Sequence, residues 1–295
     1  MTARRHEVPD STYDPVMEAN DLVCIIGDDG LLVTVASTTD PGQNVRMLNR
    51  SRFDSPEHLA AAVAALQPAS AIVLAPQPGE GESLALAGVK AAAWLVPPVR
   101  EREKAVDLSG FTRVVASCPS SAMSAGASAW TLLPLPVSDT LFSTASVRMS
   151  TPRPFFDGPT SERRDRFLQP IKHRFDVLHL VSGATESQML DLMSGCEIAV
   201  DLQEDPKLPA RDRIGPALAS GMLVLTEGPL SQPGLVDGEH LLTFSTPDEL
   251  ELLISDAIRE PESFASIRSA GREMAERRRS SRLIAQISSE LIASS

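Results

Sequence analysis

The sequence predicts an α/β protein built from two Rossmann-like domains that face a cleft. At 295 residues the chain exceeds the roughly 100–200 residues of a typical single domain. Short apolar runs alternate with helical patterns along both halves, which is typical of parallel sheets covered by helices. Residues 138–152 are rich in Ser and Thr and lack a clear hydrophobic period, so we expect the domain boundary there. We therefore predict a flexible N-terminus over residues 1–20 and domains over 21–145 and 146–295.

The first half is expected to alternate strands with helices. Short runs of buried-type residues bounded by Gly, Pro, Asp or Ser predict strands. A helix is expected over 56–67, because Ser55 is a favourable N-cap. The expected strands are 22–27, 31–37, 70–76, 91–97, 111–117 and 130–137.

The second half repeats this alternation with clearer helix starts. Thr160 or Ser161 can cap a helix over 161–173, and Thr185 can cap one over 185–195. The last helix or two are expected to return toward the first domain, and the cleft between the domains is the natural ligand site. The expected strands are 153–158, 175–181, 196–202, 222–228 and 240–244, and the closing helices are 247–260, 261–279 and 280–292.

Charge and hydropathy argue against nucleic-acid and membrane partners. The net charge is −12 and aromatic residues make up only 4% of the chain, so we expect neither attraction to polyanions nor a base-stacking surface. Arg277, Arg278 and Arg279 follow Glu273 and Glu276, and this pattern predicts solvated ion pairs on an exposed helix face. No run approaches the ~20 apolar residues of a membrane span, and the N-terminus is too polar for a signal peptide. We expect a cytoplasmic protein.

The sequence offers no metal-binding or cofactor motif. It contains no CxxC, HExxH or P-loop, and its five histidines include no pair at metal-ligand spacing. Cys24, Cys118 and Cys196 are far apart and each adjoins apolar residues, which is typical of reduced core thiols. We therefore expect no bound metal and no cofactor.

The order of several segments resembles the glycosyltransferases of the GT-B fold. The similarity is to the C-terminal, nucleotide-sugar-binding domain of the family 4 (group 1) enzymes and of the related spore-maturation glycosyltransferase-like proteins. One segment of the first half, LPLPVSDTLF (133–142), is similar to the turn that ends the N-terminal domain in these enzymes. The segments of the second half that carry the resemblance are FFDG with Arg163 and Arg164, MLDLMSGCEIAVDL (189–202), RDRIGPALASGMLVLTEGP (211–229), GLVDGEHLLTFSTPDELELLISDAI (234–258) and GREMAERRRSSRLIAQI (271–287).

The resemblance implies that residues 146–295 bind a nucleotide-diphosphate sugar and that 21–145 form the acceptor side. A diphosphate held without metal needs helix-start N–H groups and arginines. Each arginine also has a plainer interpretation as a solvated surface charge, and Gly183 as a simple turn glycine. The candidate binding residues are Gly158, Arg163, Arg164, Gly183, Arg211 and Arg213.

The stretch around Pro216 departs from the family pattern. The resemblance implies one glutamate at this position, which would hold the ribose hydroxyls, and a second acidic residue at the position of Leu208, facing the transferred sugar. Neither Pro216 nor Leu208 can accept a hydrogen bond through its side chain. Pro216 is compatible with a helix start, where its missing N–H would be unpaired in any case. Asp205 and Asp212 lie close enough in sequence to compensate, so we take them as the candidate catalytic carboxylates.

The first half lacks a glycine-rich acceptor loop after its first strand. Asp28 and Asp29 can be interpreted as a general base for an acceptor hydroxyl or as a solvated D-G hairpin turn.

Three hypotheses about function follow from the sequence. The chain is a glycosyltransferase acting on an unknown acceptor, a catalytically inactive relative that binds a sugar, nucleotide or protein partner, or another two-domain Rossmann-like enzyme. The third would need a dinucleotide fingerprint or a His and Glu constellation, and neither is present.

Overall fold

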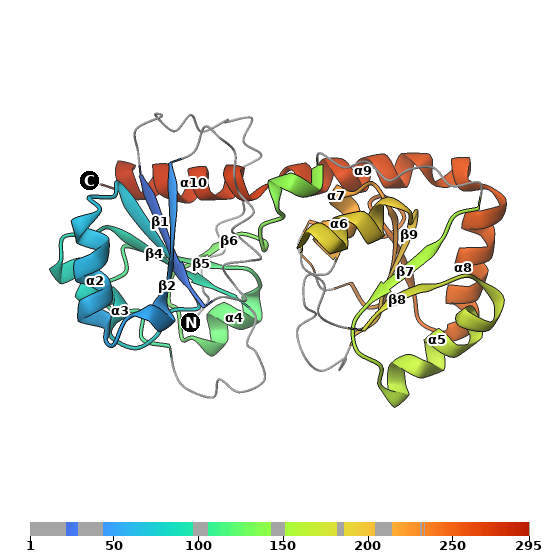
Figure 1. The fold of residues 1–295 in the computed structure, drawn as a ribbon, viewed down its shortest axis with the longest axis horizontal. Coiled ribbons are helices and arrows are strands. Elements are labelled where there is room, and N and C mark those ends of the chain that lie inside the picture. The colour runs from blue at the N-terminus through green and yellow to red at the C-terminus, as the bar shows by residue number, and fades with distance from the viewer. Residues whose placement is uncertain are drawn as a thin grey trace. The chain divides into compact units, whose positions relative to one another are not determined.

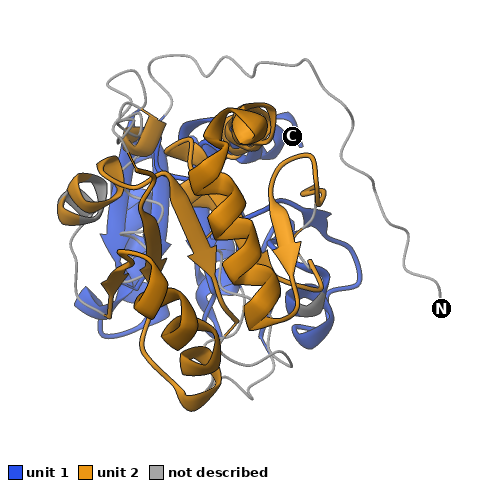
Figure 2. Cartoon of the chain, turned by 90° about the vertical axis from the view of Figure 1, so that its right-hand side faces the viewer, with its two compact units in different colours: residues 1–139, 279–295 blue, residues 140–278 orange. Residues whose placement is uncertain are grey.

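The chain forms two compact units in a computed structural model (Figures 1 and 2). Unit 1 comprises residues 1–139 and 279–295, and unit 2 comprises residues 140–278. The chain therefore passes into unit 2 within the stretch 138–152 and returns to unit 1 before its last helix. The structure describes residues 22–28, 44–96, 106–142, 151–181, 186–203, 214–230, 232 and 234–294.

Unit 1 is built on a six-stranded parallel sheet with the strand order β2-β1-β3-β4-β5-β6. Strand β2 (Val45–Asn49) and helices α3 (Glu80–Leu86) and α4 (Pro119–Ser124) are not among the predicted elements, whereas the predicted segment 31–37 lies outside the described residues. The remaining elements are β1 (Val23–Gly27), η1 (Arg50–Arg52), α2 (Pro56–Ala65), β3 (Ser70–Leu74), β4 (Ala91–Leu95), β5 (Arg113–Ala116), β6 (Thr131–Leu132), η2 (Asp139–Phe142) and α10 (Ser280–Ala293).

The alternation of side chains along β1 separates the two faces of this sheet. Cys24 and Ile26 lie in a cluster with residues of α2 and α3, and Val23 and Ile25 lie in another cluster with residues of α10. The α10 residues of that second cluster are Leu283, Ile284, Ile287 and Leu291. Figure 1 shows α10 running along the sheet of unit 1. The last helix belongs to unit 1 because its apolar stripe completes this core.

Unit 2 is built on a five-stranded parallel sheet with the strand order β11-β10-β9-β7-β8. The predicted N-cap Ser161 is confirmed, since its side chain accepts a hydrogen bond from the Arg164 N–H. The elements are β7 (Pro154–Asp157), α5 (Glu162–Arg174), β8 (Leu178–Leu180), α6 (Glu186–Ser194), β9 (Ile198–Asp201), α7 (Ile214–Ala219), β10 (Leu223–Glu227), β11 (Leu242–Phe244), α8 (Pro247–Arg259), η3 (Pro261–Phe264) and α9 (Ala265–Glu276).

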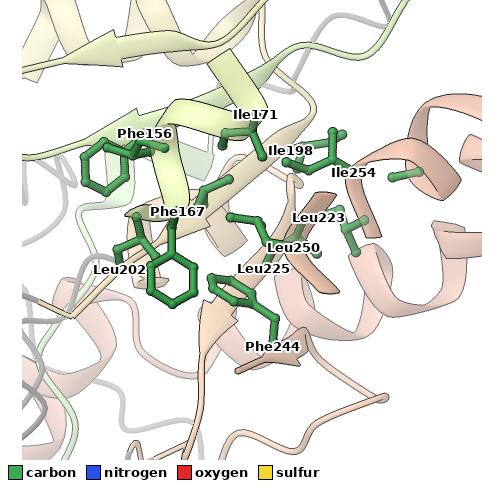
Figure 3. Close-up of a cluster of buried hydrophobic side chains, with 13 residues drawn as sticks. Phe156, Phe167, Ile171, Ile198, Leu202, Leu223, Leu225, Phe244, Leu250 and Ile254 are labelled. Carbon is green, nitrogen blue, oxygen red and sulfur yellow. The ribbon is translucent and has the colours of Figure 1, made fainter. Parts of the chain in front are cut away.

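Two helices cover one face of this sheet with a continuous apolar core (Figure 3). Phe167, Leu168 and Ile171 of α5 and Leu250 and Ile254 of α8 pack against alternate residues of the strands. Helix α9 packs closely against α7, because a Cβ atom at Gly271 would lie 2.7 Å from the Leu218 side chain of α7 and 2.5 Å from the His240 carbonyl oxygen. These contacts fix where α5 and α7 begin relative to the strand ends.

The prediction of an exposed arginine face over 277–279 is wrong for Arg278, whereas Arg277 is exposed as predicted. Helix α9 ends at Glu276, and Arg278 is only 2% exposed. Its guanidinium donates to the Gln232 side chain, while Arg279 pairs with Asp139 at the start of α10. The three arginines therefore lie where α9 ends and α10 begins, and Arg278 is the buried one among them. Within the described residues no helix has the length and apolar character that crossing a bilayer requires.

Candidate functional site

The strand order of unit 2 places a topological switch point at β7. The chain continues from β7 to β8 on one side and then crosses to β9 on the other. In open parallel sheets, ligands bind outside the carboxyl ends of the strands at such a point. Three acidic residues mark these ends, namely Asp157 of β7, Asp201 of β9 and Glu227 of β10.

The turn after β7 carries the predicted residue Gly158. Its φ of 146° lies in a region that favours glycine. The Gly158 N–H donates to the Leu180 carbonyl at 2.8 Å, so this N–H group is committed to the sheet and not to a ligand. Helix α5 starts four residues later, and of its first-turn N–H groups that of Arg164 is taken by the Ser161 side chain, whereas those of Glu162 and Arg163 have no partner within the helix. A phosphate group at this edge would meet the start of α5 rather than Gly158 itself.

Arg164, the second predicted arginine, is a buried structural group. It is 1% exposed, and its guanidinium donates to the carbonyls of Pro159 at 3.0 Å and Leu202 at 3.1 Å. It also lies 5.7 Å from the centre of the Phe156 ring. Arg164 therefore joins the turn after β7 to the segment after β9.

Arg163 is placed differently, although it adjoins Arg164 in the first turn of α5. Its guanidinium donates to the Gln203 carbonyl at 2.7 Å and pairs with the Glu227 carboxylate. The Gln203 N–H donates to the same carboxylate at 3.2 Å. The Arg163 side chain is 29% exposed, and five N–H donors on a guanidinium leave some of them able to meet a ligand.

Pro216 is the third residue of α7 as described, two positions later than a first helical position. Its carbonyl accepts from the Ser220 N–H at 3.1 Å and the Ser220 hydroxyl at 3.0 Å. The proline therefore fits the helix, and its side chain offers no acceptor. The other candidates, Gly183, Asp205, Leu208, Arg211, Asp212 and Arg213, lie outside the described residues.

Two residues of this edge were not among the sequence predictions. His179 of β8 donates to the Gly158 carbonyl at 2.8 Å, and Glu227 of β10 receives Arg163. A charged residue that ends a buried strand run was the available signal for Glu227. His179 had no such signal, because only the sheet brings it opposite Phe156.

The carboxyl edge of unit 1 carries its own polar cluster. Arg50 donates to the carbonyls of Ala75 at 2.9 Å and Leu74 at 2.5 Å, and its Nε lies 3.6 Å from the buried Glu80 and 3.4 Å from Asp28. The hairpin interpretation of Asp28 is wrong, because β1 pairs in parallel on both of its edges. Among the described residues, no group of three His, Cys, Asp or Glu side chains is arranged to hold a metal ion.

Comparison with known proteins identifies the fold. Residues 163–287 match the protein family described as glycosyl transferase-like. HepE of Anabaena, in a crystal structure with UDP and glucose, matches with a TM-score of 0.55 and 12% identity over 93% of this chain and 100% of that one. A glycosyltransferase from Rickettsia africae matches with a TM-score of 0.64 and 11% identity over 92% and 97%. AviGT4, a glycosyltransferase involved in avilamycin A biosynthesis, matches with a TM-score of 0.57 and 15% identity over 92% and 97%.

These matches confirm the α/β architecture and the resemblance to glycosyltransferases of the GT-B fold. At identities of 11–15%, the likeness to the solved structures is one of fold. No curated protein sequence matches the chain.

Proposed function

We propose that this chain transfers a sugar from a nucleotide-diphosphate sugar to an acceptor. Its fold is GT-B, and its residues 163–287 match a glycosyl transferase-like family. The observation that carries the proposal is the carboxyl edge of unit 2. There, at the switch point of the sheet, the start of α5 and the partly exposed Arg163 lie together. HepE, which shares the fold, was crystallised with UDP-glucose, and this supports a nucleotide sugar as the ligand.

In this proposal the leaving diphosphate is the group that the site stabilises. Cleavage of the bond to the sugar leaves negative charge on the diphosphate, and fixed donors aimed at that charge lower the barrier. Arg163 and the first-turn N–H groups of α5 supply such donors, and we assign this role to them in place of a bound metal ion. Arg211 and Arg213 remain candidates for the same role, and Asp205 and Asp212 for the role of the missing carboxylates.

A second candidate function is a glycosyltransferase-like protein without catalysis, which binds a nucleotide, a sugar or a partner protein. Pro216 is the observation that favours it. In α7 this residue stands where the family resemblance implies a ribose-holding glutamate, and its ring offers no hydrogen-bond acceptor. Loss of a carboxylate that binds two hydroxyl groups removes much of the specificity for a ribose, while the fold stays intact.

Titration with UDP, GDP and dTDP and with their sugars tests both candidates. A ligand that binds only the folded protein raises its Tm by mass action. The expected result is a Tm increase with at least one nucleoside diphosphate, together with slow release of that diphosphate from its sugar. If no nucleotide changes the Tm or gives heat in calorimetry, the donor-site proposal is wrong.

The variant Pro216→Glu distinguishes the active from the inactive candidate. Removal of this proline should destabilise the fold only modestly, by about 0.4–1 kcal/mol, through the entropy of the unfolded chain. If the rest of the donor site is intact, the new carboxylate should tighten nucleoside diphosphate binding several-fold. Pro216→Gln is the matched control, since it removes the ring without adding charge. Turnover by the unmodified protein would show that Asp205, Asp212 or another group supplies the missing function.

A further inference from the structure

We propose that His179 and Arg164 are positioning residues of the donor site, which hold the two carbonyls of the β7–α5 turn away from the anion. This inference rests on the proposed function, because it concerns the same diphosphate-binding edge. It gives Arg164 a role different from direct contact with phosphate.

The His179 ring is held from both sides. Lys172 of α5 lies 2.7 Å from Nδ1, and Nε2 lies 2.8 Å from the Gly158 carbonyl oxygen. Since a lysine ammonium only donates and a carbonyl only accepts, Nδ1 must accept and Nε2 must carry the proton. The imidazole also packs against Phe156, with the ring centres 5.0 Å apart. The neutral ring therefore has one tautomer and one orientation, in which it binds Gly158.

Arg164 holds the next carbonyl in the same way. It donates to Pro159 at 3.0 Å and to Leu202, beyond the end of β9, at 3.1 Å. The guanidinium is buried, so these donors face the protein and not solvent. A single side chain thus ties the turn after β7 to the segment after the neighbouring strand.

The consequence is electrostatic. A carbonyl oxygen carries partial negative charge, and two of them directed at the start of α5 would repel a diphosphate there. With the Gly158 carbonyl bound by His179 and the Pro159 carbonyl bound by Arg164, both dipoles are directed at partners inside unit 2. The N–H groups of Glu162 and Arg163 and the Arg163 side chain are left as the groups that meet an anion, since the Arg164 N–H donates to Ser161. A turn fixed in this way binds without reorganisation of its backbone.

The test measures the affinity of the full-length protein for UDP, GDP and dTDP in variants of His179. His179→Leu removes the donor to Gly158, and loss of that alignment should weaken binding about tenfold. His179→Gln restores an N–H donor at the place of Nε2, so its affinity should return to within about threefold of the parent. His173→Leu is the matched control, because His173 is an exposed histidine of α5, next to Lys172, and the affinity of this variant should not change. The amide hydrogen exchange of residues 158–163 should quicken in His179→Leu and recover in His179→Gln.

The outcomes separate this inference from the proposed function. If the parent protein binds a nucleotide and His179→Leu binds it equally well, the positioning role is wrong while the donor site stands. If the parent binds none of the three nucleotides, the proposed function and this inference both fail. Should His179→Leu not fold, Lys172→Met carries the test, because it removes only the donor to Nδ1 and should weaken binding about threefold. Unchanged affinity in that variant would also overturn the role.

Discussion

At the carboxyl edges of both sheets an arginine side chain donates to backbone carbonyls. The edge of unit 2 also has a second arginine whose side chain is partly exposed. In unit 1, Arg50 closes the edge by donating to Leu74, the last residue of β3, and to Ala75, which follows it, and the Arg50 side chain is 10% exposed. In unit 2, Arg164 does the same for Leu202 beyond β9 and is 1% exposed. The side chain of Arg163, the residue before Arg164, is 29% exposed.

This difference shows that an arginine at a strand end is not by itself a sign of anion binding. A guanidinium that donates to carbonyls of its own unit serves the fold, as Arg50 and Arg164 do. Arg163 combines a fixed position with remaining exposure, and it lies at the start of a helix of 13 residues. The comparison therefore favours Arg163 of unit 2 over Arg50 and Arg164 as the arginine that meets the diphosphate of the proposed function.

The largest expected effect is on the stability of unit 1. Arg50→Ala removes the cation beside Glu80, whose side chain is 3% exposed and accepts from the Gln77 N–H at 2.7 Å. Loss of one partner of a buried charge pair typically costs about 3–5 kcal/mol, so we expect a decrease of about 3 kcal/mol in the free energy of unfolding. Urea denaturation followed by circular dichroism measures it.

Arg52→Ala is the control for this prediction. Arg52 belongs to the same short helix and is exposed, so its replacement should change the free energy of unfolding by no more than about 0.5 kcal/mol. Equal effects of Arg50→Ala and Arg52→Ala would mean that Arg50 does not serve the fold, and the contrast between the two edges would be lost.

A smaller effect, on binding rather than stability, is expected at Arg163. A hydrogen bond from a guanidinium to a charged group contributes about 1.5–3 kcal/mol, so Arg163→Ala should weaken the binding of a nucleoside diphosphate at least tenfold. Arg166→Ala removes the same charge from an exposed position of α5 and should leave the affinity nearly unchanged. Isothermal titration calorimetry compares the two variants.

The Glu227 carboxylate complicates the single variant, because it is only 7% exposed and loses its guanidinium partner. The double variant Arg163→Ala with Glu227→Gln removes both charges and keeps the site neutral. It should bind as weakly as Arg163→Ala while recovering part of any lost stability. Parent-like affinity in the double variant would assign the diphosphate to other groups.

Local patterns predicted the elements that carry most of this edge. The apolar runs around β7, β9 and β10 and the Ser161 cap of α5 depend on nearest neighbours in sequence, and the structure confirms them. Strand β2 was missed because its residues are only partly buried and give no clean alternation. His179 joins the edge through strand pairing with β7, and Glu227 meets Arg163 from a distant segment, and a single sequence reveals neither contact.

The last helix, α10, which belongs to unit 1, shows the same limit of prediction from a single sequence. The apolar residues of α10 predicted a helix over 280–292, but the surface that it covers depends on the alternate residues of β1, β3 and β4 in unit 1. The buried pair Ser70–Ser288, with hydroxyl oxygens 2.7 Å apart, adds a polar contact between segments far apart in sequence. Arg278 was expected on a solvated face for a related reason, since Glu273 and Glu276 precede the arginines in the sequence whether the helix continues or breaks.

The smallest effect is one in which the two units should behave alike. Burial raises the pKa of Cys24 in unit 1 and of Cys196 in unit 2 to about 11, and both side chains are 0% exposed. The unfolded chain releases these protons nearer pH 9, so the contribution of each thiol to stability is present below that pH and is lost as the pH rises toward about 11.

In native protein at pH 8, a thiol reagent should therefore label only Cys118 quickly, since it is the least buried of the three. The decrease in Tm between pH 8 and pH 10.5 should be smaller in Cys24→Ala and in Cys196→Ala than in the parent, by a similar amount in each. If one of these two cysteines reacts as fast as Cys118, the core of its unit opens more readily than that of the other, and the difference between the units would extend beyond their carboxyl edges.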